Sequence, residues 1–104
     1  MDLLQGTLEL LILKTLVTRD LHGYGIAQTI LSSSRETLDV QQGSLYPALH
    51  RLERKGLVTS EWKESENGRM AKFYALTRTG RKQLDAEVEQ WQRYSRAIGW
   101  VLQS

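Results

Sequence analysis

The spacing of apolar and polar residues along the chain predicts a first helix that is buried on several sides. Over residues 3–17, apolar side chains fill most positions, and Glu9 and Lys14 are the charged interruptions. A helix that is apolar nearly all round is covered on more than one face. In so small a protein, we expect part of that cover to come from a partner chain.

A second helix is predicted after a glycine-containing turn. Gly23 and Gly25 break the apolar pattern and mark the turn. Apolar residues then return at helical spacing and predict the inner face of a helix over residues 26–32: Ile26, Ile30 and Leu31. We expect a loop over residues 32–36 and interpret residues 38–40 as one short strand.

The third predicted helix has two unlike sides. Leu45, Leu49 and Leu52 fall within one narrow sector when successive residues are placed about 100° apart. The opposite side carries Gly43, Pro47, His50, Arg51 and Arg54. Proline is tolerated in a first helical turn, so we expect the helix to begin close to Gly43 or Ser44. Gly56 is the expected terminator.

A β-hairpin and a long final helix complete the pattern. Residues 57–64 and 70–77 are strand-like and flank Asn67-Gly68, a strong hairpin signal. If these two residues form the turn, Trp62 faces Phe73, and the alternation leaves open which face of the hairpin is buried. We expect Thr77 to cap a helix from about Arg78 to Leu102. Its apolar residues recur at steps of three and four, as in a coiled-coil seam: Leu84, Val88, Trp91, Ile98 and Leu102.

Composition narrows the classes of function. The 104 residues suggest one domain, and the absence of cysteine excludes disulfides and cysteine-ligated zinc. His22 and His50 alone do not make a metal site. Motifs for an activated serine, a zinc protease or a phosphate-binding loop are absent, so we expect no catalysis and no cofactor. The N-terminal segment lacks the basic start of a signal peptide, so we expect a cytoplasmic protein with no membrane contact.

Positive charge is concentrated in the middle of the chain. Residues 41–82 hold nine Lys/Arg against four Asp/Glu, whereas residues 1–40 and 83–104 each carry a small negative excess. A basic footprint in one region is typical of a surface that binds phosphates.

The order of elements predicts a mainly α fold with a small β-hairpin, a winged helix-turn-helix. Residues 1–77 would form the DNA-binding unit, and residues 78–104 a dimerisation helix that packs with the first helix. The third helix would enter a major groove while the hairpin, or wing, reaches phosphates. The residues expected to contact DNA are Tyr24, Ser44, Tyr46, His50, Arg51, Arg54, Lys55, Arg69 and Lys72. For Tyr24 and Tyr46, packing in a turn or core is an equal alternative.

Four segments in order resemble the PadR family of bacterial transcriptional regulators: LQGTLELLILKTL, LHGYGIAQ, QGSLYPALHRLERKGLV and KFYALTRTGRKQL. The resemblance covers residues 4–84. It implies a homodimeric repressor held together by the C-terminal helix and the partner's first helix, acting on an inverted-repeat operator in double-stranded DNA.

Trp91 has two interpretations. On the seam it is most simply a packing residue between protomers. The segment WQRYSRAI also resembles a part of multidrug-binding PadR regulators where tryptophans stack planar aromatic drugs, which implies a small-molecule effector at Trp91. Two other functions compete with DNA regulation. A winged-helix protein–protein adaptor would show no salt-sensitive DNA binding, and a small-molecule-binding dimer would show tryptophan quenching without DNA affinity.

Overall fold

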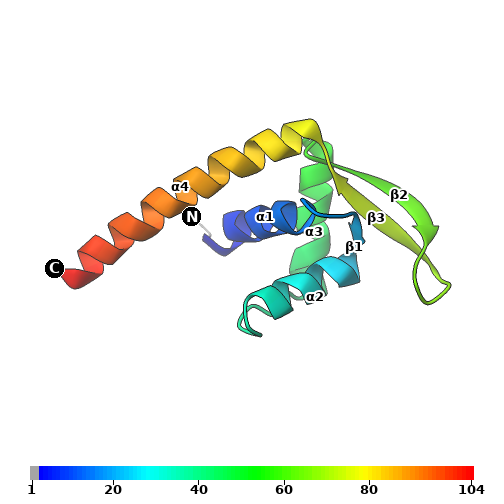
Figure 1. The fold of residues 1–104 in the computed structure, drawn as a ribbon, viewed down its shortest axis with the longest axis horizontal. Helices are drawn as coiled ribbons and strands as arrows, with labels where there is room; N and C mark the ends of the chain where they lie inside the picture. The colour runs from blue at the N-terminus through cyan, green and yellow to red at the C-terminus, as the bar shows by residue number, and fades with distance from the viewer. Residues whose placement is uncertain (1–2) are drawn as a thin grey trace.

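The computed structural model describes residues 3–104, so residues 1 and 2 of the predicted DNA-binding unit lie outside the described part. The predicted order of three helices, a hairpin and a long helix is confirmed (Figure 1). The helices are α1 (Leu3–Thr15), α2 (Gly23–Ser33), α3 (Gln42–Arg54) and α4 (Arg78–Gln103), and the strands are β1 (Leu21–His22), β2 (Val58–Glu64) and β3 (Met70–Leu76).

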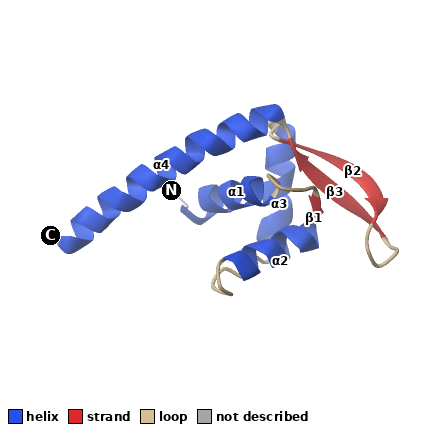
Figure 2. Ribbon diagram, in the orientation of Figure 1, coloured by secondary structure: helices blue, strands red, loops and turns tan. Residues whose placement is uncertain are grey.

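The molecule consists of a compact head from which two elements project. Figure 2 shows α1, α2 and α3 gathered together, with the β2–β3 hairpin extending to one side and α4 to the other. The extents are 54 × 29 × 24 Å, and α4 accounts for much of the long dimension. Over residues 3–104, no helix combines the length and the apolar character needed to cross a membrane.

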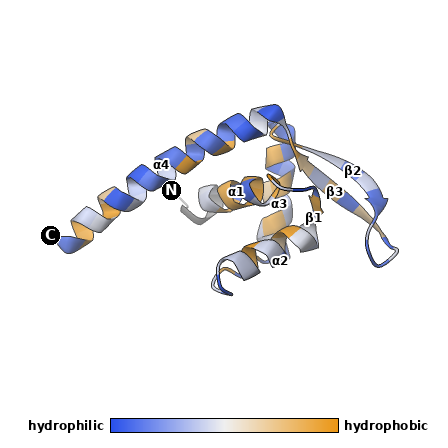
Figure 3. Cartoon of the chain, in the orientation of Figure 1, coloured by the Kyte–Doolittle hydropathy of each residue, from blue (hydrophilic) through white to orange (hydrophobic). Residues whose placement is uncertain are grey.

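One hydrophobic core joins all the helices to the sheet. Its fully buried side chains come mainly from α1, α2 and α3, where the hydrophobic residues of Figure 3 concentrate. The largest of them are Ile12, Leu13, Ile26, Leu45, Leu49, Leu52 and Val58. The inner faces predicted for the second and third helices are confirmed at Ile26, Ile30, Leu45, Leu49 and Leu52. The remaining inner-face prediction, Leu31, is only partly buried.

The first helix obtains much of its cover from its own chain. α1 lies between α2 and α4 and also packs on α3 (Figure 1). Ile12 and Leu13 are buried, as is Leu16 just after the helix, and Leu8, Leu10 and Leu11 are partly buried against the same core. Because three helices surround α1, its apolar character does not by itself require a partner chain.

The sheet contains a third strand, β1, which lies earlier in the chain than the short strand predicted from the sequence. The strand order is β1-β3-β2, all antiparallel, and Leu21 pairs with Tyr74 while His22 pairs with Phe73. The strand predicted over residues 38–40 is absent, and the backbone N–H of Leu38 instead donates to Ser34 Oγ at 2.9 Å. Leu21 is buried and Leu38 is exposed, so burial selects the earlier segment for the sheet.

The hairpin register differs by one residue from that predicted for a two-residue turn. Trp62 pairs with Lys72, and Phe73 pairs with Glu61. The loop is a wider turn in which the N–H of Gly68 donates to Ser65 O at 2.9 Å. Gly68 has a φ of +83°, the left-handed conformation that ends a three-residue hairpin loop. The register places Val58, Tyr74 and Leu76 on the face that meets the core, which settles which face is buried.

Helix α3 begins earlier than predicted but ends as expected. Its N-cap is Gln41, which makes no side-chain capping bond, so Pro47 lies inside the helix rather than in its first turn. Packing of the apolar side therefore overrides the unfavourable proline. At the other end Gly56 has a φ of +75°, and Leu57 N–H donates to Leu52 O at 3.0 Å. This pattern is a glycine-terminated C-cap.

A tight junction attaches α4 to the end of α3. Thr77 Oγ1 accepts from Gly80 N–H at 2.9 Å, which confirms the predicted cap, and it donates to Gly56 O at 2.7 Å. The Thr77 N–H also donates to Leu57 O. A Cβ at Gly80 would lie 2.0 Å from Leu57 O, so only glycine allows this approach. The junction fixes the direction in which α4 leaves the head.

We predict that Gly80→Ala destabilises the protein by about 1–3 kcal/mol or more, because its methyl group meets a fixed carbonyl. The matched control is Gly99→Ala, also inside α4, where an added Cβ meets nothing within 4 Å. That change should stabilise by about 0.5–1 kcal/mol through helix propensity. Chemical denaturation measures both values. Equal small effects would show that the Gly80 contact is not required.

Candidate nucleic-acid interface

Helix α3 has one buried side, two occupied flanks and one open front. The buried side chains Leu45, Ala48, Leu49 and Leu52 are each 1 % exposed or less. The opposite side, here called the α3 front, is exposed to solvent throughout and consists of Gly43, Pro47, His50 and Arg54. A helix held by its back with its other side free has the form needed to enter a major groove.

His50 and Arg54 supply the polar groups of the α3 front. They are four residues apart and therefore lie on the same face of the helix. Both are exposed, and neither has an ion-pair partner within the described residues. Their donors are therefore available to an acceptor outside the chain.

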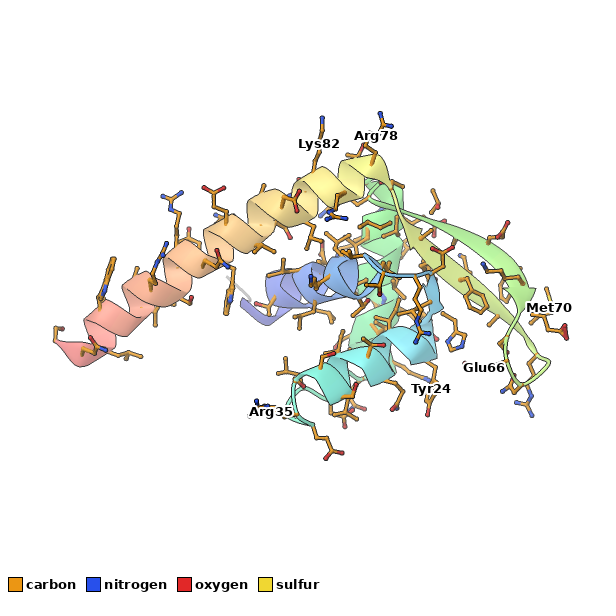
Figure 4. The ribbon with its side chains drawn as sticks, viewed as in Figure 1. Tyr24, Arg35, Glu66, Met70, Arg78 and Lys82 are labelled. Atoms are coloured by element: carbon orange, nitrogen blue, oxygen red, sulfur yellow. The ribbon has the colours of Figure 1, made fainter. Side chains whose placement is uncertain are left out.

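Tyr46 and Tyr24 lie where α2 meets the N-terminal half of α3. Tyr46 remains 46 % exposed while its ring packs closely over Gly23, where an added Cβ would lie 2.6 Å from the phenol oxygen. Tyr24 projects from the start of α2 and is well exposed (Figure 4). The α2 N-cap, His22, was not recognised from the sequence, and its Nδ1 accepts from Gly25 N–H at 3.0 Å.

Arg51 and Lys55 occupy the flank of α3 that faces α1. Arg51 Nε donates to Glu9 Oε2 at 3.0 Å, and Lys55 Nζ donates to Glu9 Oε1 at 3.3 Å. The expectation that Arg51 lies on the open side of the helix is therefore wrong. At 100° per residue it lies about 60° from Arg54, close enough to α1 for the nearly buried Glu9 carboxylate to bind it. Ser44 is on the same flank and is exposed.

The other flank of α3 faces the sheet and is held by Glu53. Its Oε2 accepts from Ser60 Oγ at 2.6 Å, and its Oε1 lies 3.7 Å from Lys72 Nζ. Lys72 also lies over the Tyr74 ring, 5.8 Å from its centroid. Burial, followed by the nearby Glu53 and Tyr46, raises the pKa of the Tyr74 phenol, so it stays neutral at ordinary pH.

The tip of the wing is exposed and carries Arg69. The Arg69 backbone is fixed by the turn, since its N–H donates to Asn67 Oδ1 and its carbonyl accepts from Ser65. Its side chain has no ion-pair partner in the described part of the chain. Glu66 and Met70 also lie at the tip (Figure 4). The turn therefore fixes the backbone of Arg69, and its exposed side chain is available to bind.

Two glutamines at the start of α3 were missed by the sequence reasoning. Gln41 occupies the N-cap position and Gln42 is the first residue of the helix, and both are exposed. The N-terminal residues of a recognition helix are those that reach base edges in helix-turn-helix proteins. Placing the start of the helix at Gly43 or Ser44 put these glutamines in the preceding loop. The sequence feature that could have identified them is a pair of glutamines directly before an amphipathic helix.

The apolar stripe of α4 is buried at one end and open at the other. Leu84 is 3 % exposed and belongs to the core of its own chain, and Val88 packs partly against that core. The predicted seam is therefore not exposed at these two residues. Beyond them the helix leaves the head, and Trp91 and Ile98 are 45 % and 49 % exposed. Leu102 is also exposed.

Two further apolar residues extend the open part of the stripe. Tyr94 and Val101 are exposed, and with Trp91 and Ile98 they follow the three-four-three spacing of a coiled-coil seam. The seam predicted from the sequence had the same kind of spacing but did not include Tyr94 and Val101. Trp100 is exposed on the opposite side of the helix. In the described part of the chain, no three His, Cys, Asp or Glu residues are grouped so as to hold a metal ion.

Comparison with known proteins gives a consistent result. The model of the transcriptional regulator PadR-like family matches residues 12–86. The chain is 32 % identical over 94 residues to transcriptional regulator Rv3488 of Mycobacterium tuberculosis, a match that covers 90 % of this chain and 84 % of that protein.

Solved structures resemble the whole chain. A transcriptional regulator from Clostridium thermocellum aligns with a TM-score of 0.85 at 27 % identity, covering 95 % of this chain and 96 % of the other. A PadR-like transcriptional regulator from Bacillus cereus aligns with a TM-score of 0.82 at 28 % identity, covering 100 % and 99 %. Both alignments extend through α4.

Proposed function

We propose that this chain, which belongs to the PadR-like family of transcriptional regulators, is a homodimeric repressor that binds double-stranded DNA through the α3 front and the wing. The observation that carries the proposal is the contrast between the two sides of α3. Its back is sealed in the core, and its front presents His50 and Arg54 without partners in the described residues.

The roles of the proposed contacts follow from where each group lies. His50, Arg54 and the exposed Gln42 would meet base edges, because an α-helix fits the major groove and these groups lie on its free surfaces. Arg69 would contact phosphates from the wing tip. Tyr24, Ser44 and Tyr46 border the α3 front and would position the helix on the backbone. Lys72, half-exposed beside Glu53, would add to the electrostatic attraction.

We predict that Arg54→Ala and Arg69→Ala weaken DNA binding in different ways. Loss of Arg54 should cost about 1–3 kcal/mol on the preferred duplex and relax sequence preference. Loss of Arg69 should weaken binding to preferred and random duplexes alike and lower the salt slope by about one unit. Arg96→Ala, an exposed cation on the projecting part of α4, is the matched control and should change neither.

Fluorescence anisotropy over a range of salt concentrations separates these outcomes. If Arg96→Ala weakens DNA binding as much as Arg54→Ala, the overall positive charge of the protein, and not the α3 front, accounts for its affinity for DNA.

The dimer is proposed from the continuity of the α4 stripe. Its first half packs on the head, and its second half carries five exposed apolar side chains: Trp91, Tyr94, Ile98, Val101 and Leu102. A seam with coiled-coil spacing is covered most simply by a second copy of itself. A two-fold dimer would place two α3 helices about one helical turn, roughly 34 Å, apart on DNA, which matches an inverted-repeat operator.

We predict that Ile98→Asp converts the dimer to a folded monomer, because it places a charge in the seam and lies outside the core of the head. Val88→Asp is less suitable, since Val88 packs on that core. Trp100→Asp is the control, because it adds the same charge at an exposed apolar residue on the opposite side of the helix. Light scattering at micromolar concentration gives the mass. A wild-type monomer at that concentration would contradict the proposed dimer.

An effector response is proposed at Trp91, where the stripe leaves the head. A planar aromatic compound stacked there between protomers would change the spacing of the two heads. It would release DNA only to the extent that it binds the DNA-incompetent state more tightly. Trp91 is half-exposed in the single chain, so a ring face is available for stacking.

We predict that Trp91→Ala still dimerises and binds DNA but needs a higher concentration of such a compound for release. The assay is DNA release by a planar aromatic dye, with Trp100→Ala as the control on the opposite side of α4. Release of Trp91→Ala at the wild-type concentration would show that Trp91 only packs.

A further inference from the structure

Glu9 is a nearly buried carboxylate that binds two cations of the recognition helix. Its side chain is 12 % exposed, and each of its two oxygens accepts from a different cation. Arg51 comes from α3 and Lys55 is the C-cap of the same helix, one turn later, while Glu9 comes from α1. The arrangement is a three-residue ion cluster between α1 and the flank of α3.

The chemistry of this cluster is that of a phosphate contact. An arginine or lysine donates to a carboxylate and to a phosphate oxygen through the same charge-assisted hydrogen bonds. Arg51 and Lys55, four residues apart, would repel each other without an anion between them. The Glu9 carboxylate therefore occupies donors that are next to the α3 front and would otherwise be available to the DNA backbone.

The cluster changes which cations can contribute to DNA affinity. Arg51 is only 27 % exposed in the pair, and its guanidinium is directed toward α1. Of the arginines and lysines expected to contact DNA, Arg54 on the front and Arg69 at the wing tip are then the two without an ion-pair partner in the described residues. Phosphate contacts give affinity that is independent of sequence, whereas base contacts give specificity. Removing two cations from the phosphate contacts therefore favours specificity over affinity.

We propose that Glu9 is a specificity-determining residue: it holds Arg51 and Lys55 on α1 and so lowers the affinity of the protein for arbitrary DNA. The inference rests on the proposed DNA-binding function. It assigns a role in that function to a residue that lies outside the α3 front. Glu9 acts through Arg51 and Lys55 and does not itself touch DNA.

The experiment measures binding of the full-length protein to a random-sequence duplex at several salt concentrations. Glu9→Gln keeps the size of the side chain and removes its charge, so the two cations become available to phosphates. Each new phosphate contact steepens the salt slope by about 0.9. Lowering the salt from about 200 to 50 mM increases the affinity of every DNA-binding variant. With two new contacts per protomer, this increase should be roughly tenfold larger per protomer for Glu9→Gln than for the wild type. The ratio of preferred to random binding falls.

Two matched variants distinguish release of these cations from a general change in charge. Asp85→Asn also removes one negative charge and frees one cation, Arg81, but on α4, so it should leave the slope unchanged. The triple variant Glu9→Gln, Arg51→Gln, Lys55→Gln removes the cluster entirely. Its slope should equal that of the wild type, because these cations do not contact phosphate when Glu9 holds them.

The results that overturn the proposal are distinct from failure of DNA binding itself. An unchanged or shallower slope for Glu9→Gln, with wild-type binding intact, overturns it. So does a triple variant whose slope is lower than that of the wild type, since the cations would then already contact phosphates. The triple variant decides the question even if Glu9→Gln folds poorly. Urea denaturation under the binding conditions reports whether each variant is folded. A wild type that binds no duplex at all overturns the proposed function as well.

Discussion

The burial of one side of α3 determines most of what the rest of the structure does. Four side chains of this helix are almost completely removed from water and contact α1, α2 and the sheet. Burying them contributes on the order of 1.5–3 kcal/mol for each leucine. That energy fixes the rotation of α3 about its own axis. Once the rotation is fixed, the position of every other side chain on the helix follows from the 100° step.

The flanks of α3 explain why its basic residues are not equivalent. Arg51 and Lys55 are bound by Glu9 on one side, and Lys72 lies beside Glu53 on the other. Arg54, only three residues from Arg51, faces open solvent. Charge counted along the sequence therefore overstates the positive charge that a partner meets. The surface that remains is narrow, and its groups lie on a rigid helix.

The junction at Thr77 and Gly80 connects this surface to the projecting helix. Thr77 bonds to the end of α3 while it caps α4, and Gly80 lies against the Leu57 carbonyl. A rotation of α4 must therefore move the end of α3 or break these contacts. The same apolar stripe runs from the core at Leu84 to the open end of α4. In the proposed dimer, this connection makes the distance between two recognition helices depend on the α4 seam.

The elements were predictable because their apolar periodicity is strong, and the errors arose at one turn and where longer-range contacts decide. Helix order, the Gly56 terminator and the Thr77 cap follow from local patterns. The hairpin register was not predictable because Gly68 forms a wider turn than an Asn-Gly pair usually makes. The start of α3 was misplaced because tertiary packing tolerates Pro47 inside the helix. The position of Arg51 depends on Glu9, 42 residues away, which no helical periodicity reveals.

The central claim, that the α3 front enters DNA, can be tested by site-directed cleavage. The chain has no cysteine, so Gly43→Cys provides a single attachment point on the α3 front for an iron chelate that cuts nearby DNA. Gly99→Cys provides the same attachment point on distal α4, and an added Cβ at either glycine meets nothing within 4 Å. With a duplex selected by the wild-type protein, the label at residue 43 should cut at the major groove of the bound site, and the label at residue 99 should not. A bound complex that gives no localised cutting from residue 43, or the same cutting from both, would contradict the account.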